Sequence, residues 1–162
     1  MQIGNFRRVL LPFLSFSAQF LLLAPAAGEQ TFRSDDWITE CNGGTSDCSI
    51  TVPFWQTQGD RAGSFALVVM LQTGNIGIVG QPLPIKAVLR IDKNPPIECK
   101  DAPYCIFPSA QAIAAVRQLK VGSLILIDVF TAKATFTFSL TTKGYQAGMA
   151  KIRAWGYRLP ID

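Results

Sequence analysis

The chain of 162 residues contains no histidine. Histidine is the side chain that most often acts as a general base near neutral pH, and it is also the commonest ligand of transition metals. Its absence excludes Ser-His-Asp and Cys-His catalysis built from this chain alone. We therefore expect no enzymatic activity, no metal site and no cofactor.

Charged residues are also scarce, at 16% of the chain, with a formal net charge of +4. Two of the basic residues, Arg7 and Arg8, lie in an N-terminal segment typical of export signals, and removing them lowers the formal net charge to +2. Nucleic-acid binding needs clustered positive charge, and the sequence has no such cluster. We expect no nucleic-acid partner.

The chain also lacks an apolar run long enough for a convincing membrane span. The two N-terminal arginines precede a mostly apolar run from Val9 to Leu23, and the small residues 24–28 follow. A spanning helix needs roughly 20 apolar residues, whereas a basic start, a short apolar core and a small-residue end are typical of a cleaved secretory signal. We predict a signal peptide over residues 1–28 and a single domain over 29–162 with no membrane span after cleavage. An uncleaved anchor is the alternative.

Four cysteines are present, and they form two close pairs, Cys41 with Cys48 and Cys99 with Cys105. Thiols carried to an oxidising compartment tend to form disulfides. Four cysteines allow three connectivities, and we favour the two local bridges because each enclosed loop contains glycine or proline, as turns do. Redox motifs favour two intervening residues and zinc sites two to four, so these wider spacings fit neither alternative well.

From Trp37 onward the pattern is mostly that of β-strands. Apolar or alternating segments predict strands at 37–41, 49–55, 65–71, 85–92, 124–130 and 134–140. The run 65–71 is apolar throughout, which predicts a strand covered on both faces. Pro53 should lie at a sheet edge or a bulge. The residues from 74 to 84 are rich in glycine and proline, and we expect them to form a loop.

Two segments break the alternation and predict helices at 110–120 and 144–153. Ser109 and Thr142 are the candidate N-terminal caps. The residues expected to face inward are Ala112, Ile113, Val116 and Leu119 in the first helix, and Tyr145, Met149 and Ile152 in the second. The pattern as a whole predicts an all-β dominated fold, an antiparallel β-sandwich with one or two short helices.

Two groups of carboxylates are candidates for chemistry. The first group is Asp35, Asp36 and Glu40, and the second is Glu98 and Asp101. Paired carboxylates can hydrolyse glycosides or bind calcium. Neither group lies in a loop of regularly alternating ligands with a fixed glycine, so we interpret both as solvated loop charges.

Asp128 and three aromatic residues are further candidates. Asp128 lies within an apolar strand, where it is either a buried functional acid or a residue on a solvent-facing edge; we favour the second interpretation. Phe54, Trp55 and Phe65 form either an exposed binding patch or part of the core, and their strand spacing favours the core.

The order of these features resembles a known family. It includes Trp37 four residues before Cys41, the two cysteine pairs, and the closing stretch Ser139-Leu140-Thr141-Thr142-Lys143-Gly144-Tyr145. Over roughly residues 37–152 the chain looks like the invasion-associated locus B family of exported bacterial proteins. The resemblance implies an immunoglobulin-like β-sandwich with two small helices, a periplasmic or secreted location, and no known enzyme activity.

These observations favour a non-enzymatic envelope protein that acts by protein–protein contact through a sheet edge or an apolar face. Its partner would be an envelope or host protein, and a homo-oligomer is compatible with the same interpretation. The alternatives are a small carbohydrate-binding or hydrolytic periplasmic protein that uses the acidic loops, and a secreted host-cell invasion factor. A broad exposed apolar face would favour contact, whereas a concave acidic pocket would favour the carbohydrate alternative.

Overall fold

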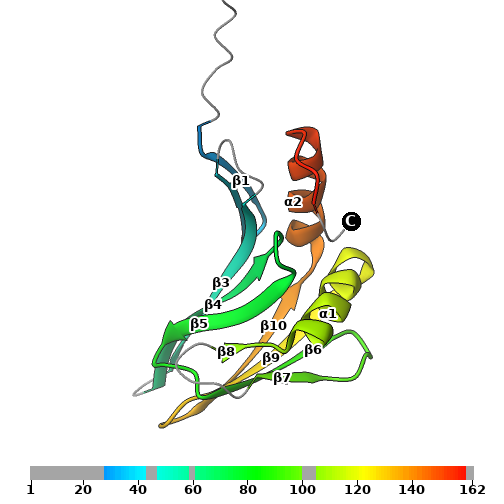
Figure 1. The fold of residues 1–162 in the computed structure, drawn as a ribbon. Coiled ribbons are helices and arrows are strands. Elements are labelled where there is room, and N and C mark those ends of the chain that lie inside the picture. Colours follow the sequence, from blue (N-terminus) through cyan, green and yellow to red (C-terminus); the bar gives the residue numbers. More distant parts are fainter. Residues whose placement is uncertain (1–27, 43–46, 59–60, 100–104, 160–162) are drawn as a thin grey trace, which may run out of the picture.

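The structure is a computed structural model, and it describes residues 28–42, 47–58, 61–99 and 105–159. Except for Gly28, the predicted signal peptide therefore lies outside the described residues. Within the described ranges the chain forms ten strands and two helices, arranged as two packed sheets with the helices at one end (Figure 1). The predicted fold class, a β-sandwich with short helices, is confirmed.

The two sheets contain six and four strands, and all neighbouring strands are antiparallel. The first sheet has the order β1 (Gln30–Ser34), β2 (Trp37–Cys41), β3 (Cys48–Gln58), β4 (Arg61–Met70), β5 (Asn75–Gln81) and β8 (Cys105–Ile106). The second has the order β10 (Thr135–Thr141), β9 (Leu124–Phe130), β6 (Lys86–Ile91) and β7 (Ile97–Cys99). The helices are α1 (Ser109–Val121) and α2 (Lys143–Ala154).

Aromatic side chains from both sheets meet in the core. The ring of Phe54 on β3 lies 4.5 Å from that of Phe138 on β10, and Phe65 on β4 lies 5.2 Å from Phe136. Such pairs contribute about 0.5–1.5 kcal/mol beyond the burial of their area. The core interpretation is therefore confirmed for Phe54 and Phe65, whereas Trp55 points away from the core and is 65% exposed.

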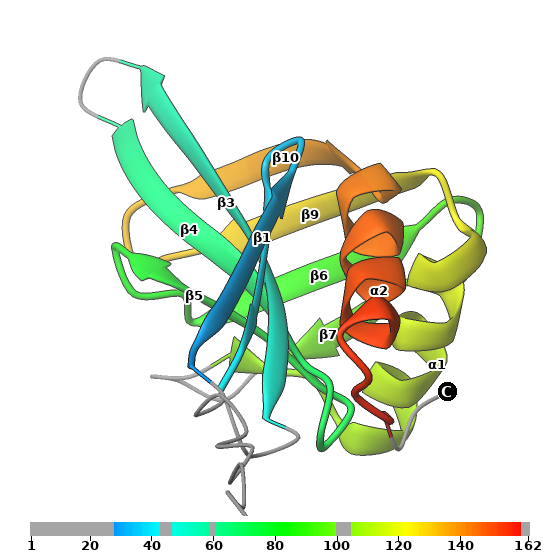
Figure 2. The same cartoon turned by 90° about the horizontal axis from the view of Figure 1, so that it is seen from above.

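The helix α2 packs on the inner side of the first sheet, beyond the part that the second sheet covers (Figure 2). Two glycines allow the close approach. A Cβ atom at Gly144 would overlap the carbonyl oxygen of Ser34, and one at Gly148 would overlap Oγ1 of Thr39. The inward face predicted for this helix is correct, because Tyr145, Met149 and Ile152 are all buried.

The predicted helix caps are wrong in detail. Pro108 takes the N-cap position of α1, and Ser109 is the first residue of the helix. Thr142 occupies the N-cap position of α2, but its hydroxyl donates to the carbonyl of Gly122, which joins the start of α2 to the end of α1. Ile113 is 37% exposed, because Ala112, Ala115, Val116 and Leu119 form the buried side of α1.

The strand β5 runs through the segment that the sequence predicts as a loop. Gly80 is paired with Phe65 on β4, and a Cβ atom at Gly80 would overlap both the ring of Phe65 and the carbonyl oxygen of Ser64. The glycine is therefore required by close packing within a strand. It does not mark a turn, and the prediction of a loop here is wrong.

Pro53 lies in an interior strand at a point where that strand is locally an edge. The pairing of β2 with β3 ends at Ile38 opposite Thr51, whereas β4 pairs with β3 as far as Gln58. Pro53 thus has a neighbouring strand on one side only. The predicted edge position is correct for this part of β3.

The structure contains the disulfides Cys41–Cys48 and Cys99–Cys105, the pairing favoured from the sequence. The first joins neighbouring residues of β2 and β3. The second joins β7 to β8 and so ties one sheet to the other. Two disulfides indicate an oxidising, extracytoplasmic environment. Neither described helix has the length and apolar character that a membrane-spanning helix requires.

Reducing the disulfides should lower the melting temperature strongly. Loop-closure entropy assigns each bridge about 2–2.5 kcal/mol, against a total stability of about 5–15 kcal/mol for a typical domain. Thermal melts of the oxidised and reduced protein, followed by circular dichroism, measure the effect. A chelator added to the oxidised protein is the control and should leave the melting temperature unchanged. Unfolding by the chelator but not by the reductant would contradict this expectation.

Candidate functional site

The side of the six-stranded sheet that faces away from the core is mostly apolar. The strand registers align its side chains in rows across the sheet. One row runs from Arg33 and Ile38 past Thr51, Val68 and Gly77 to Ile106, and the next contains Pro53, Ala66 and Val79. The outer apolar face is defined by Ile38, Pro53, Trp55, Ala66, Val68, Met70, Val79 and Ile106.

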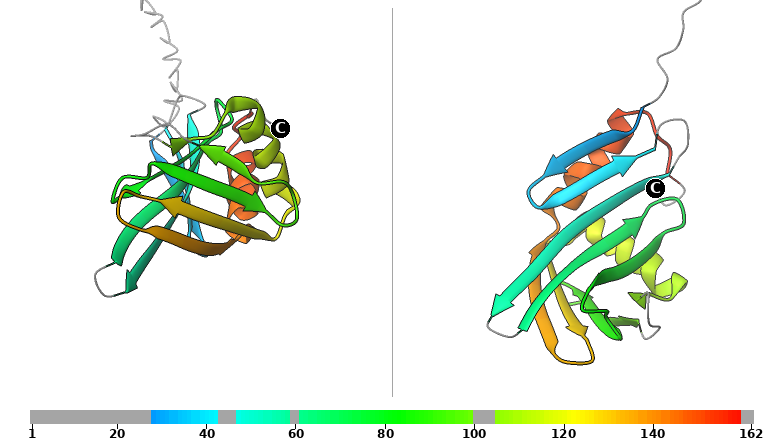
Figure 3. Two further views of the ribbon diagram at one scale, coloured as in Figure 1. Left: turned by 90° about the horizontal axis from the view of Figure 1, so that it is seen from below. Right: turned by 90° about the vertical axis from the view of Figure 1, so that its left-hand side faces the viewer.

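Three exposed side chains of this face, Met70, Val79 and Ile106, line one groove, and Trp55 lies apart from them on β3. Trp55, Met70, Val79 and Ile106 are each at least 38% exposed. A shallow groove of about 220 Å³ lies at the β5–β8 side, lined by Val68, Met70, Val79 and Ile106 among others. The right-hand view of Figure 3 shows no described helix or strand over this face, because both helices lie behind the sheet.

Of the two faces of the strand at 65–71, which the sequence predicts to be covered on both sides, described residues cover only the inner one. Phe65, Leu67, Val69 and Leu71 are buried in the core. The residues between them point outward and are only half-buried or exposed. Both faces of the strand are apolar, so the alternation between core and surface is hidden in the sequence.

The outer face of the four-stranded sheet has the opposite character. Lys86 forms an ion pair with Glu98 at 3.3 Å, and its Nζ lies 5.3 Å from the ring centre of Phe130. Asp128 accepts a hydrogen bond of 2.6 Å from the hydroxyl of Thr137. Asp128 is thus a partly exposed residue on a solvent-facing surface, which agrees with the interpretation favoured from the sequence.

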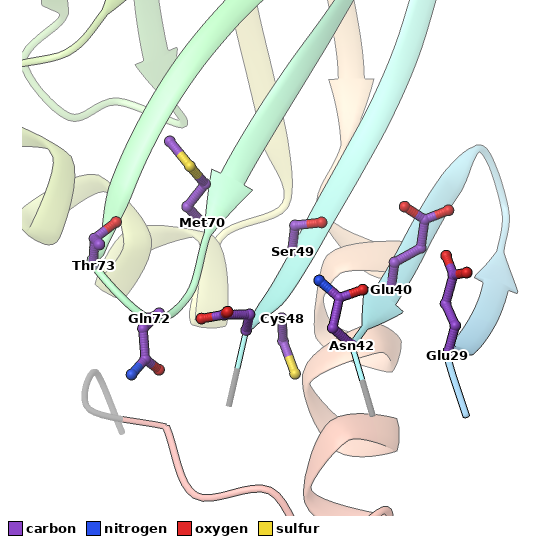
Figure 4. A pocket seen from close by; sticks show the side chains of 9 residues that line it. Glu29, Glu40, Asn42, Cys48, Ser49, Met70, Gln72 and Thr73 are labelled. Atoms are coloured by element: carbon purple, nitrogen blue, oxygen red, sulfur yellow. The ribbon is translucent and has the colours of Figure 1, made fainter. Parts of the chain in front are cut away.

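One end of the outer apolar face opens into a pocket of about 290 Å³ (Figure 4). Its lining comprises Glu29, Glu40, Asn42, Asp47, Cys48, Ser49, Met70, Gln72 and Thr73. Glu40, Ser49 and Met70 form one row across β2, β3 and β4. The pocket is therefore continuous with the outer apolar face, and it adds three carboxylates to one end of that face.

The structure brings together only part of the predicted acidic groups. Glu40 lines the pocket, whereas Asp35 and Asp36 form the exposed turn between β1 and β2. Glu98 pairs with Lys86, and Asp101 lies outside the described residues. In the described ranges, no cluster of three or more histidine, cysteine, aspartate or glutamate residues is arranged to hold a metal ion.

Sequence reasoning missed Glu29 and Asp47 as members of the acidic pocket. Both are distant from Glu40 along the chain, and only the pairing of β1 with β2 and of β2 with β3 brings them near it. The acidic residues next to Cys41 and Cys48 could have indicated this pocket, because that disulfide requires β2 and β3 to run side by side.

The outer apolar face and the acidic pocket form one continuous surface. Its chemistry suits a partner with apolar side chains and a positive charge at one end. No protein-family model matches the chain, and comparisons with curated proteins and with solved structures found no match either.

Proposed function

We propose that this protein is an exported, non-enzymatic envelope protein that acts by protein–protein contact through its outer apolar face. The observation that carries the proposal is the exposure of Trp55, Met70, Val79 and Ile106 on one side of a sheet, where the half-buried Ala66 and Val68 lie between them. With strands about 4.8 Å apart and same-face residues about 6.7 Å apart, the eight residues that define the face cover roughly 260 Å². Exposed apolar patches with a polar rim often mark contact sites.

Trp55 is the candidate anchor of the contact. It is the most exposed of the side chains that define the outer apolar face, and its row continues through Ser64 and Gln81, both uncharged. Tryptophan is enriched among the residues that dominate binding energy at interfaces. A partner pocket that covers this ring would remove a large apolar surface from water.

The acidic pocket would orient the bound partner and raise the rate at which it associates. Glu29, Glu40 and Asp47 place negative charge at one end of the face, while Arg33 lies beside Ile38 at its β1 edge. Complementary charge steers diffusional encounter and sets register more than it adds affinity. The partner we infer therefore carries lysine or arginine beside its apolar side chains.

The cellular compartment that we propose rests on the N-terminal segment and the disulfides. An N-terminal segment typical of a secretory signal and two disulfides support a periplasmic or secreted protein. The order of Trp37, the cysteines and the closing 139–145 stretch supports a protein of the invasion-associated locus B type. The natural partner is then an envelope protein, or a host protein if the chain is secreted.

A second candidate function is binding or hydrolysis of a small carbohydrate in the acidic pocket. Its volume of about 290 Å³ and its three carboxylates favour this candidate. Its lining contains no aromatic side chain on which a sugar ring could stack. We therefore rank it below protein contact.

Replacing Val68 by lysine should weaken partner binding by about tenfold or more, because the change puts a charge in the middle of the outer apolar face. Val88→Lys is a matched control, since Val88 is equally half-buried but faces outward beside Asp128 on the other sheet. The binding partner is recovered from the envelope with the wild-type protein, identified by mass spectrometry and titrated in purified form. Equal affinity for both variants would reject the outer apolar face as the contact surface.

Replacing Glu40 by glutamine should slow association with the same partner and flatten its salt dependence, because a steering charge is lost. Asp36→Asn removes an exposed charge outside the pocket and should have little effect. Surface plasmon resonance at several salt concentrations measures both rates. A saccharide that binds the wild-type protein and the Val68→Lys variant but not the Glu40→Gln variant would instead support the carbohydrate candidate.

A further inference from the structure

The four edge strands of the two sheets differ in their protection against pairing with another chain. Short length, charge and proline normally protect such edges. β8 and β7 have two and three residues, and β1 carries Arg33 and runs into Asp35 and Asp36. β10 has seven residues and contains no charge, proline or glycine. Of these four edge strands it is the least protected.

Hydrogen bonds at the two ends of the β9–β10 hairpin determine which groups of β10 point away from β9. The N–H of Thr131 donates to the carbonyl of Ala134, and the N–H of Thr142 donates to the carbonyl of Ser123. The register between these ends is regular, and bonded residues alternate in an antiparallel pair. The even-numbered residues of β10 therefore bond to β9, and the odd-numbered residues direct their N–H and C=O groups outward.

An independent contact agrees with this assignment. The indole Nε1 of Trp37, which belongs to the other sheet, donates to the carbonyl oxygen of Thr141 at 2.8 Å. No described strand pairs with the outward groups of Thr135, Thr137 and Ser139, whose side chains are exposed. Figure 2 and the left-hand view of Figure 3 show β10 at the rim of its sheet with β9 on one side only.

We propose that β10 pairs antiparallel with β10 of a second copy, so that two four-stranded sheets become one continuous sheet across a two-fold axis. In the register that places Thr137 opposite its own copy, Thr135 faces Ser139. Every outward N–H and C=O group from Thr135 to Ser139 then has a partner. The bond between Trp37 and Thr141 is left intact.

The chemistry of β10 makes a second copy the fitting partner. The strand presents only hydroxyl side chains on one face and Phe136, Phe138 and Leu140 on the other. In this register Phe136 faces Phe138 of the copy, and aromatic and Thr–Ser cross-strand pairs are favourable. The Asp128 carboxylates of the two copies would lie three strand spacings apart, about 14 Å, which exceeds the screening length of about 8–10 Å. The two Asp128 carboxylates therefore do not oppose the pairing.

A single strand pair buries less surface than the about 1,200 Å² of a standard stable interface. The dimer should therefore form and dissociate with concentration. It uses an edge of the four-stranded sheet, whereas the proposed function uses a face of the six-stranded sheet. The two proposals are independent.

Sedimentation equilibrium of the exported, disulfide-bonded protein tests the pairing with charge variants at the two-fold axis. Thr137→Lys and Thr137→Glu each place like charges opposite one another across the axis, and each should weaken the dimer by about tenfold or more. The introduced glutamate also faces Asp128 of its own chain, so the fold of this variant is checked by circular dichroism. An equimolar mixture of the two variants should restore the dimer, because opposite charges then face across the axis. Val88→Lys, on β6 and two strands away from the β10 edge, adds the same charge outside the strand pair and should have no effect.

Amide exchange of the wild-type protein provides a readout that needs no variant. Exchange at Thr135, Thr137 and Ser139 should slow as concentration rises, while exchange at Phe136 and Phe138 should not change. A monomer at every soluble concentration, or a dimer that Thr137→Lys leaves unchanged, overturns the proposal. A dimer lost in Val68→Lys but kept in Thr137→Lys would place the contact on the outer apolar face instead.

Discussion

The indole of Trp37 holds the two sheets and α2 together at one point. Its ring packs edge-on against Tyr145 of α2, with centroids 5.7 Å apart, and its N–H binds the carbonyl of Thr141 on β10. The side chain is 2% exposed, so this bond is shielded from water. Gly144 allows the helix to approach, because a Cβ atom there would overlap the indole. The disulfide Cys99–Cys105 supplies a second, covalent link between the sheets.

With these two links in place, the inner side of the six-stranded sheet packs against the second sheet and the helices. The folded chain gains nothing from apolar side chains on the outer side, where Trp55, Val79 and Ile106 remain exposed. The four-stranded sheet shows what an ordinary solvated face looks like, with Lys86 and Glu98 paired across it. The contrast between two faces of one small protein is the reason to assign the more apolar one to a contact.

The sequence predicts well those elements whose period is uninterrupted. The arm that contains Phe136 and Phe138 alternates cleanly, and it forms β10 as expected. Sequence patterns mislead where a residue type is compatible with two different structural roles. Gly80 reads as a loop residue, yet it belongs to β5 because the ring of Phe65 occupies the space of its side chain. β4 is apolar on both faces, and only the position of the second sheet decides which face is core. The acidic pocket depends on strand pairing, which local patterns do not encode.

The two proposed contacts lie on different sheets, and this has a consequence for binding strength. The outer apolar face alone covers roughly 260 Å², about a third of what one partner contributes to a standard interface. A partner bound to one such face would be held weakly. Pairing through β10 would give the assembly two copies of the face. A partner with two matching sites, or an array of partners in the envelope, would then bind through both, and the second contact would form at a high effective concentration. A modest apolar face can thus support firm attachment without becoming large enough to endanger the solubility of the free protein.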